Sequence, residues 1–310
     1  MKKFKEILLL KNLKRVGNVA INGKYNQLLN DAEDINDLIT KMETEAKFTA
    51  EDLQTAKDKA EKVYNYVNDS QINVITIFDD NYPEKLNAMK NNKPPLLYVK
   101  GNVEALNKPN MAVIGTRKPS KLSEEFESNL VKHVVNTTDN VIVSGLALGC
   151  DKIAHQTTVD EEKITIAVLP SGVDVIKPAK HKKLAEEIIE NNGCLVSEYE
   201  PKVNPNRGSY VQRDKIVAAL CDATFVVECG VKSGTMHTVK FSDEYGTPIF
   251  SYLPSERPED SFDGNEFILN EFEDSTRIEY VEEFLNELEF IKNRNTSDKP
   301  LKKEVQSRLL

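Results

Sequence analysis

A turn at residues 111–120, MAVIGTRKPS, places a cation at the end of an apolar run. The apolar residues predict a buried strand, and Gly115 predicts a tight turn directly after it. A dinucleotide-binding loop would continue with two more glycines, but Thr116, Arg117 and Lys118 follow here. This turn is the first candidate for binding an anion, because a guanidinium stays charged at physiological pH and can grip phosphate with two parallel hydrogen bonds.

Four further strand-end loops carry small or hydroxyl-bearing residues: SGLALGCD, LPSGVD, SEYEP and ECGVKSGT. Small residues let backbone N–H groups approach an anion, and hydroxyl groups add donors. Loops that follow parallel strands meet at one edge of a sheet, where helix N-termini also point. The sequence therefore predicts a phosphate site formed by several loops. Besides the first turn, its candidates are Ser144, Gly145, Ser233, Gly234 and Thr235.

Regularly alternating elements surround these loops. Continuously apolar runs from MAVIG to PIFSY alternate with helical patterns, which indicates a parallel sheet covered on both faces. Residues 1 to about 70 have apolar positions at helical spacing, and Thr49 with Asp52 forms a capping pattern. We predict an α/β fold with a doubly wound, mostly parallel sheet, preceded by a small all-α domain.

The composition indicates a globular protein with excess acid. The 310 residues carry a formal net charge of −9, and residues 251–310 hold 15 acidic against 8 basic side chains. A negative total argues against nucleic acid, but the middle of the chain is nearly balanced. No apolar run could span a membrane and no signal cleavage site is evident, so we expect a cytoplasmic protein. The scattered Cys150, Cys194, Cys221 and Cys229 predict neither disulfides nor metal binding.

The loops, in this order, resemble the motifs of the DprA/Smf family, the DNA-processing proteins of natural transformation. The matching segments are MAVIGTRKPS, VIVSGLALGCDKIAH, TIAVLPSGVDVIKP, GCLVSEYEP, YVQRDKIVAAL, ATFVVECGVKSGTMHTV and GTPIFSYLP. The resemblance implies an extended Rossmann fold that binds and protects single-stranded DNA, loads a RecA-type recombinase and works as a dimer. It implies no catalysis and no cofactor. In the family, the arginine of the first turn, here Arg117, belongs to a pocket that holds DNA phosphates.

The resemblance also divides the chain into three parts. Residues 1–70 form a helical SAM/HhH-like domain, residues 71–290 the Rossmann-like DNA-binding domain, and residues 291–310 a tail too short for the winged helix that some members carry. A helix-hairpin-helix in LKRVGNVAINGKYNQLL could grip a DNA backbone, although plain helix packing explains the same pattern.

Three positions depart from the family pattern. Leu148 stands where the family usually has a basic residue, and the family's Arg-Asn-Arg is Arg213-Asp214-Lys215 here. The family's Tyr-Pro segment is replaced by KPAKHKK, whose lysines could restore a positive rim. We expect phosphate contacts from Arg213, Lys215, Lys180, Lys182 and Lys183.

Structural roles compete with binding at several positions. Arg117 could instead neutralise a neighbouring carboxylate. We interpret His155 and His237 as structural, and Asp151 and Asp174 as helix caps rather than a catalytic pair.

Two alternatives from other classes stay open. One is a Rossmann-like nucleotide sensor or phosphoribohydrolase-like enzyme, whose motif requires a glutamate four residues after a glycine that corresponds to Gly234; that position holds Thr238. The other is a variant of the DprA core from a mobile element or defence system. The predicted dimer contact is the segment after the last apolar strand, where Phe267, Ile268 and Leu269 place apolar bulk amid negative charge.

Overall fold

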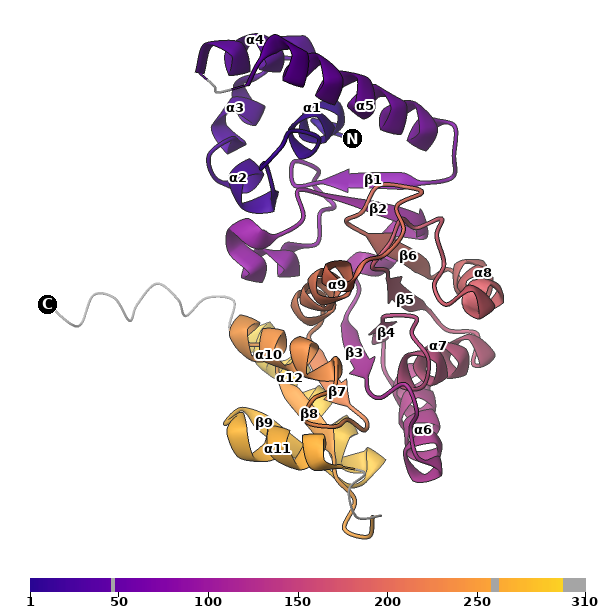
Figure 1. The fold of residues 1–310 in the computed structure, drawn as a ribbon. Helices are drawn as coiled ribbons and strands as arrows, with labels where there is room; N and C mark the ends of the chain where they lie inside the picture. Colours follow the sequence, from indigo (N-terminus) through magenta and orange to yellow (C-terminus); the bar gives the residue numbers. More distant parts are fainter. Residues whose placement is uncertain (46–47, 258–261, 298–310) are drawn as a thin grey trace, which may run out of the picture.

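A nine-stranded sheet runs through the computed structural model, which describes residues 1–45, 48–257 and 262–297 (Figure 1). Its order is β1-β2-β6-β5-β4-β3-β7-β8-β9. The strands are β1 Asn73–Thr76, β2 Leu96–Gly101, β3 Asn110–Ile114, β4 Val141–Ser144, β5 Thr165–Val168, β6 Cys194–Ser197, β7 Ala223–Val226, β8 Ile249–Tyr252 and β9 Ser275–Ile278. Strands β3 to β9 pair in parallel, whereas β1 and β2 form an antiparallel edge next to β6. The predicted fold class is confirmed.

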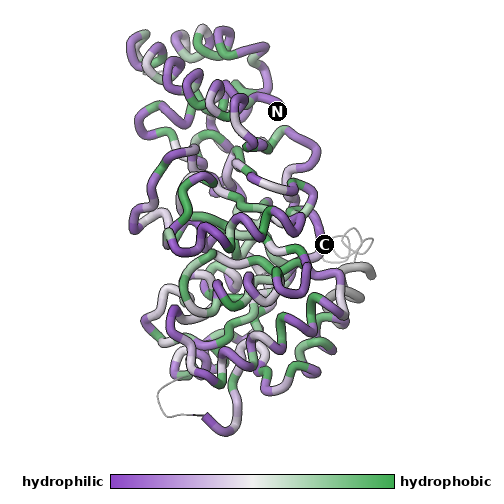
Figure 2. Tube along the Cα trace, turned by 90° about the vertical axis from the view of Figure 1, so that its right-hand side faces the viewer, coloured by the Kyte–Doolittle hydropathy of each residue, from purple (hydrophilic) through white to green (hydrophobic). Residues whose placement is uncertain are grey.

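The central strands are apolar throughout because helices cover both faces of the sheet. All five residues of β3 are buried. Met111 and Val113 pack into one helical layer, and Ala112 and Ile114 pack into the other. Figure 2 shows the hydrophobic residues gathered along the middle of the molecule, with hydrophilic residues mainly on the outer helices.

Two helical layers enclose the sheet. One layer contains α9 Arg207–Leu220, α10 Thr235–Tyr245, α11 Asp263–Glu271 and the 3₁₀ helices η1 Glu84–Asn92 and η2 Val103–Asn107. The other contains α6 Lys121–Thr137, α7 Cys150–Asp160, α8 Lys182–Glu190 and α12 Val281–Ser297. A short 3₁₀ helix, η3 Ala179–His181, leads into α8.

The amino-terminal helices extend the second layer. They are α1 Phe4–Lys11, α2 Asn18–Asn22, α3 Asn26–Asp31, α4 Ile35–Glu45 and α5 Ala50–Asn68. The predicted cap is confirmed, because the side chains and backbone N–H groups of Thr49 and Asp52 bond reciprocally at the start of α5. The ring of Phe4 lies 6.3 Å from that of Tyr98 on β2. The helices and the sheet edge therefore share one hydrophobic cluster.

The carboxyl-terminal part differs from the sequence-based expectation in three ways. A further parallel strand, β9, follows the apolar run that we expected to end the sheet. Ile268 was expected at a dimer contact, but its side chain, on α11, is fully buried in the core. Phe267 and Leu269 are half-buried. Helix α12 continues through residues 291–297 of the expected tail, and residues 298–310 lie outside the described part of the chain.

All four cysteines are buried free thiols. Within the described ranges, no cluster of three or more His, Cys, Asp or Glu side chains could hold a metal ion. None of the described helices combines the length and apolar character needed to cross a membrane.

Candidate nucleic-acid interface

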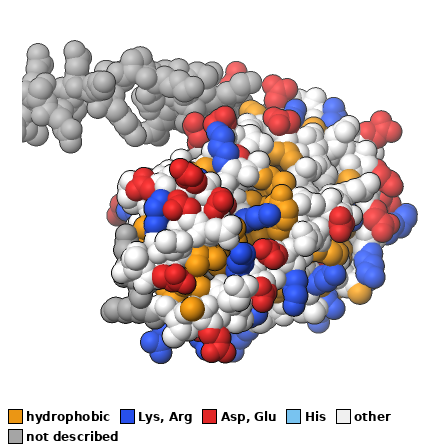
Figure 3. Space-filling model, turned by 90° about the horizontal axis from the view of Figure 1, so that it is seen from above, with side chains coloured by type: hydrophobic (Ala, Val, Ile, Leu, Met, Phe, Trp, Pro, Cys, Tyr) orange, Lys and Arg blue, Asp and Glu red, His pale blue; other side chains and the backbone are white. Residues whose placement is uncertain are grey.

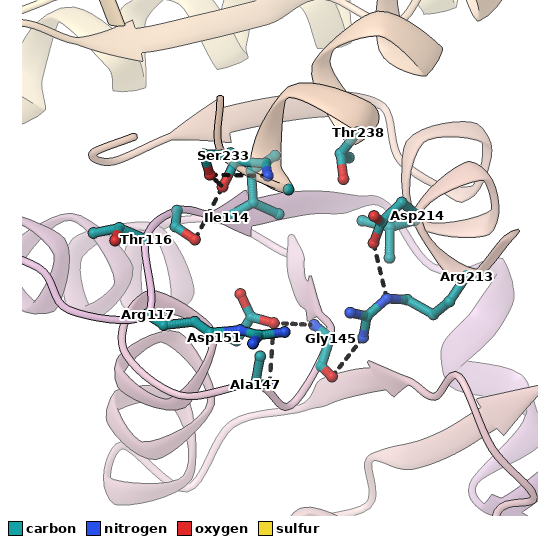
Figure 4. Close-up of a pocket in the computed structure, with 14 residues that line it drawn as sticks. Ile114, Thr116, Arg117, Gly145, Ala147, Asp151, Arg213, Asp214, Ser233 and Thr238 are labelled. Carbon is teal, nitrogen blue, oxygen red and sulfur yellow. Dashed lines mark hydrogen bonds and ion pairs between the residues drawn. The ribbon is translucent and has the colours of Figure 1, made fainter. Parts of the chain in front are cut away.

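A cavity of about 460 Å³ opens at the carboxyl ends of β3, β4 and β7 (Figure 4). The chain moves from β3 towards β4 on one side and later returns to β7 on the other, so the cavity lies at the topological switch point of the sheet. Helices α9 and α10 close its far wall. The lining residues are Ile114, Gly115, Thr116, Arg117, Gly145, Ala147, Asp151, Arg213, Asp214, Val217, Ser233, Gly234, Thr235 and Thr238.

The loop after β3 is held by its backbone. The Thr116 N–H donates to the Glu228 carbonyl at 2.7 Å, and the Thr116 carbonyl accepts from the Cys150 N–H at 3.1 Å. A β-carbon at Gly115 would collide with the Cys150 side chain, and one at Gly149 would collide with the loop backbone. Only glycine permits this close approach of the loop to the start of α7.

Arg117 extends from this fixed loop with its side chain exposed (Figure 4). No hydrogen bond or ion pair within the described chain engages its guanidinium. The neighbouring carboxylate of Glu228 is occupied, since it accepts from the N–H and hydroxyl of Ser120 at 2.9 and 2.7 Å. The alternative in which Arg117 neutralises a neighbouring carboxylate therefore finds no support in this geometry.

The loop after β4 is ordered by Asp151. One oxygen of its carboxylate accepts from the N–H groups of Gly145 and Ala147, each at 3.1 Å. Asp151 is therefore structural, but the predicted helix cap is wrong, because α7 begins after Gly149 without a side-chain cap bond. Asp174 does not cap a helix either, since it accepts from the Lys202 N–H at 2.8 Å and from the Tyr66 hydroxyl at 3.0 Å.

Arg213 joins α9 to two strand ends. Its Nη1 donates to the carbonyls of Gly145 and Val168 at 2.6 and 3.0 Å, and its Nε donates to Asp214 at 3.0 Å. The side chain is buried, and within the described chain no partner engages Nη2. Arg213 is thus mainly a brace for the cavity wall, with one amino group left for a ligand.

Asp214 is a half-buried acid beside this brace. Burial raises the pKa of its carboxyl, and the adjacent Arg213 guanidinium opposes that rise. A nearby phosphate would further disfavour the carboxylate form, because like charges repel. Asp214 therefore reduces the positive character of the wall to which Arg213 belongs.

The loop after β7 is bonded to the loop after β3 through two hydroxyl groups. Ser233 Oγ donates to Thr235 Oγ1 at 2.9 Å, and Thr235 Oγ1 donates to the Gly115 carbonyl at 3.1 Å. Gly234 between them faces open space. The loops at the switch point are therefore held in place by bonds within the chain.

Eight of the predicted residues line the cavity. They are Gly115, Thr116, Arg117, Gly145, Arg213, Ser233, Gly234 and Thr235. The structure does not bring Ser144 there, because its buried hydroxyl donates to the Val113 carbonyl at 2.7 Å. Lys118 is exposed just outside the lining, and Lys215 faces a different hollow.

The predicted lysine rim lies beyond the loop after β4. Lys180, Lys182 and Lys183 are exposed, and Lys183 forms an ion pair with Glu187 at 3.0 Å. His181 is buried among them, with its Nδ1 2.9 Å from the Leu146 carbonyl. The rim is therefore anchored to a cavity loop, although none of its lysines lines the cavity.

His155 has the structural role assigned from the sequence. It is fully buried and its Nδ1 lies 2.7 Å from Thr165 Oγ1. Burial lowers the pKa of His155 to about 3, so the ring is neutral at physiological pH.

Sequence reasoning missed several lining residues, among them Asp214 as a wall carboxylate and Thr238. Helical spacing was the available signal, because Arg213 and Val217 are four residues apart on α9 and thus share a face. Thr238 lies one turn after Gly234, in the first turns of α10.

The fold and the cavity define a Rossmann-like domain with a loop-built cavity at its switch point. The family model for DNA recombination-mediator protein A matches residues 73–289, and the chain belongs to this family, as its resemblance to DprA/Smf predicted.

Relatives with known names agree with this assignment. DNA processing protein DprA of Streptococcus pneumoniae is 35% identical over 176 residues, which are 57% of this chain and 61% of that protein. Protein Smf of Escherichia coli is 31% identical over 209 residues, which are 67% of this chain and 54% of that protein. The matches thus span little more than half the length of these relatives.

Two solved structures share the architecture. DprA from Streptococcus pneumoniae has a TM-score of 0.74 at 26% identity and covers 91% of this chain and 97% of its own. DNA processing protein A from Helicobacter pylori, described with a unique single-stranded DNA binding mode, has a TM-score of 0.63 at 30% identity. It covers 71% of this chain and 96% of its own.

Proposed function

We propose that this protein binds single-stranded DNA through its phosphates, protects the strand and loads a RecA-type recombinase onto it, without catalysis. The observation that carries the proposal is Arg117, an exposed guanidinium with no partner among the described residues, on a loop fixed at the switch point. Membership of the DNA-processing family and the printed description of the Helicobacter pylori structure support a single strand as the ligand.

The geometry supports contacts to the backbone rather than to bases. Arg117 offers paired N–H donors that match phosphate, and the hydroxyls and small residues of the Ser233–Thr235 loop leave room for a strand to approach. Contacts to phosphate carry no sequence information directly. We therefore expect binding without base preference. The affinity should fall as the salt concentration rises, and the slope of log affinity against log salt concentration should be about −0.7 for each neutralised phosphate.

The test is fluorescence anisotropy with a labelled single strand, a duplex and mononucleotides as competitors. Arg117→Ala should weaken binding of the single strand by about 1.5 to 3 kcal/mol, since it removes a charged hydrogen bond. Its unfolding temperature should stay near that of the wild type because the side chain is exposed. Lys152→Ala is the matched control, because Lys152 is an exposed cation on α7 that does not line the cavity. Equal affinities for wild type and Arg117→Ala would contradict the proposal.

The enzymatic alternative has less support from the cavity. Thr238 lines it at the position where the phosphoribohydrolase motif requires a glutamate. The two carboxylates that do line it are engaged, Asp151 with backbone N–H groups and Asp214 with Arg213. Release of a base from a nucleoside monophosphate by the purified protein would favour the enzyme.

We further propose that the protein acts as a homodimer, with the half-buried Phe267 and Leu269 on α11 as contacts. Light scattering of the wild type tests the dimer, and a monomer at micromolar concentration would contradict it. Recombinase loading is tested by the rate at which RecA forms filaments on strands coated with single-strand-binding protein. The proposal requires this protein to raise that rate.

A further inference from the structure

A second hollow, of about 720 Å³, lies between the amino-terminal helices and α9. We call it the α9 groove. It is lined by cations and amides, including Arg15, Lys24, Asn91, Asn92, Gln212 and Lys215. The cavity at the switch point contains none of these residues. The groove therefore needs its own explanation.

Its three cations have no internal carboxylate partner within the described chain. Lys24 lies 4.9 Å from the centre of the Tyr25 ring, and Lys215 lies 5.4 Å from the centre of the Phe241 ring. Both rings are neutral. Arg15 is exposed. The three cations outnumber the one carboxylate that lines the hollow, Glu198, so they repel one another, and an anion between them would relieve that repulsion.

The acid in the wall of the groove is already engaged. Glu198 accepts from the Asn18 side chain at 2.9 Å, and its carbonyl accepts from Lys11 Nζ at 2.9 Å. Burial lowers the pKa of Lys11, and the carboxylates of Glu198 and Glu200 oppose that shift. Lys11 thus offsets part of the negative charge beneath the groove, and no ion pair within the described chain engages the three rim cations.

Figure 3 looks onto the end of the molecule formed by the amino-terminal helices. Basic and acidic side chains are interspersed over it, with hydrophobic atoms between them. This end is not a continuous basic face, so a general attraction of polyanions to it is not expected. The unbalanced cations of the α9 groove are a local feature.

Helix α9 connects the groove with the switch-point cavity. Gln212 and Lys215 line the groove, whereas Arg213, Asp214 and Val217 line the cavity. Successive residues of a helix are turned by about 100°, so the two sets lie on different sides of α9. A long polyanion that passes over α9 could occupy both hollows, but a mononucleotide could occupy only one.

We infer that the α9 groove is a second contact for the same DNA strand, with phosphates at Arg15, Lys24 and Lys215. The neighbouring Asn91, Asn92 and Gln212 side chains offer amide N–H donors, which can also bond to phosphate and sugar oxygens of the strand. This inference rests on the proposed function and extends it. The amino-terminal helices then lengthen the footprint on the strand.

The test compares oligo-dT of 6 and 30 nucleotides by anisotropy. Arg15→Gln with Lys24→Gln should weaken binding of the 30-mer about tenfold or more and leave the 6-mer within about twofold, because the short strand binds at the cavity alone. The slope of log affinity against log salt concentration for the 30-mer should become shallower by about 1.4, because two phosphate contacts are lost. The matched control is Lys59→Gln with Lys62→Gln, two exposed cations on α5 outside both hollows. Arg117→Ala should weaken both lengths.

The outcomes separate the inference from the proposed function. If Arg117→Ala weakens binding but the groove variant equals its control at both lengths, the α9 groove does not bind DNA and the function stands. If Arg15→Gln with Lys24→Gln weakens binding of the 6-mer and the 30-mer by the same factor, the inference of a length-dependent contact is also wrong. If the wild type binds neither strand, both fail. Lys215→Ala should likewise weaken binding of the 30-mer and leave the affinity for the 6-mer nearly unchanged. If Lys215→Ala also weakens binding of the 6-mer, Lys215 contacts the strand at the cavity instead.

Discussion

Replacing Asp214 by asparagine should tighten binding of single-stranded DNA. Asp214 lines the cavity beside Arg213. Asparagine keeps an oxygen that can accept from Arg213 Nε but removes the negative charge from the wall. Coulomb's law gives about 2 kcal/mol between two unit charges at about 8 Å and an effective dielectric constant of about 20. Because Arg213 partly neutralises Asp214, we expect a gain of about threefold to thirtyfold.

The pH dependence supplies a second measurement of the same effect. Because burial raises the pKa of Asp214, its carboxylate takes up a proton at a higher pH than an ordinary aspartate. Wild-type affinity should therefore rise as the pH falls from 8 to 5, whereas the asparagine variant lacks this proton uptake. The ratio of the two affinities should be largest at pH 8 and shrink towards pH 5.

The assay is anisotropy with one 20-nucleotide strand at fixed ionic strength, accompanied by thermal unfolding of both proteins at each pH. An affinity of Asp214→Asn equal to or below that of the wild type at pH 8, with normal unfolding, would refute the reasoning. A ratio that does not change with pH would show that the ionisation of Asp214 does not change between pH 5 and pH 8, which would contradict the second measurement.

Two further predictions concern the scaffold. Gly145→Ala should lower stability by about 1 to 3 kcal/mol and weaken strand binding, because the added β-carbon would collide with the Arg213 guanidinium. Gly234→Ala is its control, since Gly234 has open space and an ordinary helical backbone, and an early melting transition in it would contradict this account. Glu127→Gln should stabilise the fold at pH 8 and have little effect at pH 5. Burial raises the pKa of Glu127, so the contribution of its protonated carboxyl to stability is present at low pH and is lost as the pH rises. The gain, read from urea titrations, should grow by up to about 1.4 kcal/mol per pH unit, and a gain that is larger at pH 5 would reverse the sign of the argument.

The sequence predicted the sheet because its parallel strands are buried on both faces and thus apolar throughout. β3 to β8 all have this character, whereas β9, STRI, is a half-exposed edge strand without an apolar run and was missed. Ile268 was assigned to a dimer contact because this short segment places apolar side chains amid negative charge. Because side chains point in different directions around a helix, α11 directs the Ile268 side chain into the core.

The sequence predicted which loops form the candidate site, because the path of the backbone decides their position. It did not predict which side chains face the cavity, because that depends on the direction of each side chain. The strand-end rule identified the loops that contain Gly115, Gly145 and Thr235, because it depends only on topology. Residue type did not reveal that the Ser144 hydroxyl bonds back to the neighbouring strand. Arg213 and Lys215 were grouped as neighbours in the sequence, but two positions on a helix differ by about 200°.

Net charge was the least informative signal because binding depends on which charges lack partners. The cavity is lined by two arginines and two aspartates, a balance that would predict no attraction for DNA. Asp151 bonds to backbone N–H groups, and Asp214 forms an ion pair with Arg213, so Arg117 is the lining cation without a partner in the described chain. The same argument identifies Arg15, Lys24 and Lys215 in a protein whose total charge is −9. A formal count gives each ion equal weight, whereas a phosphate is attracted mainly by cations that no carboxylate already neutralises.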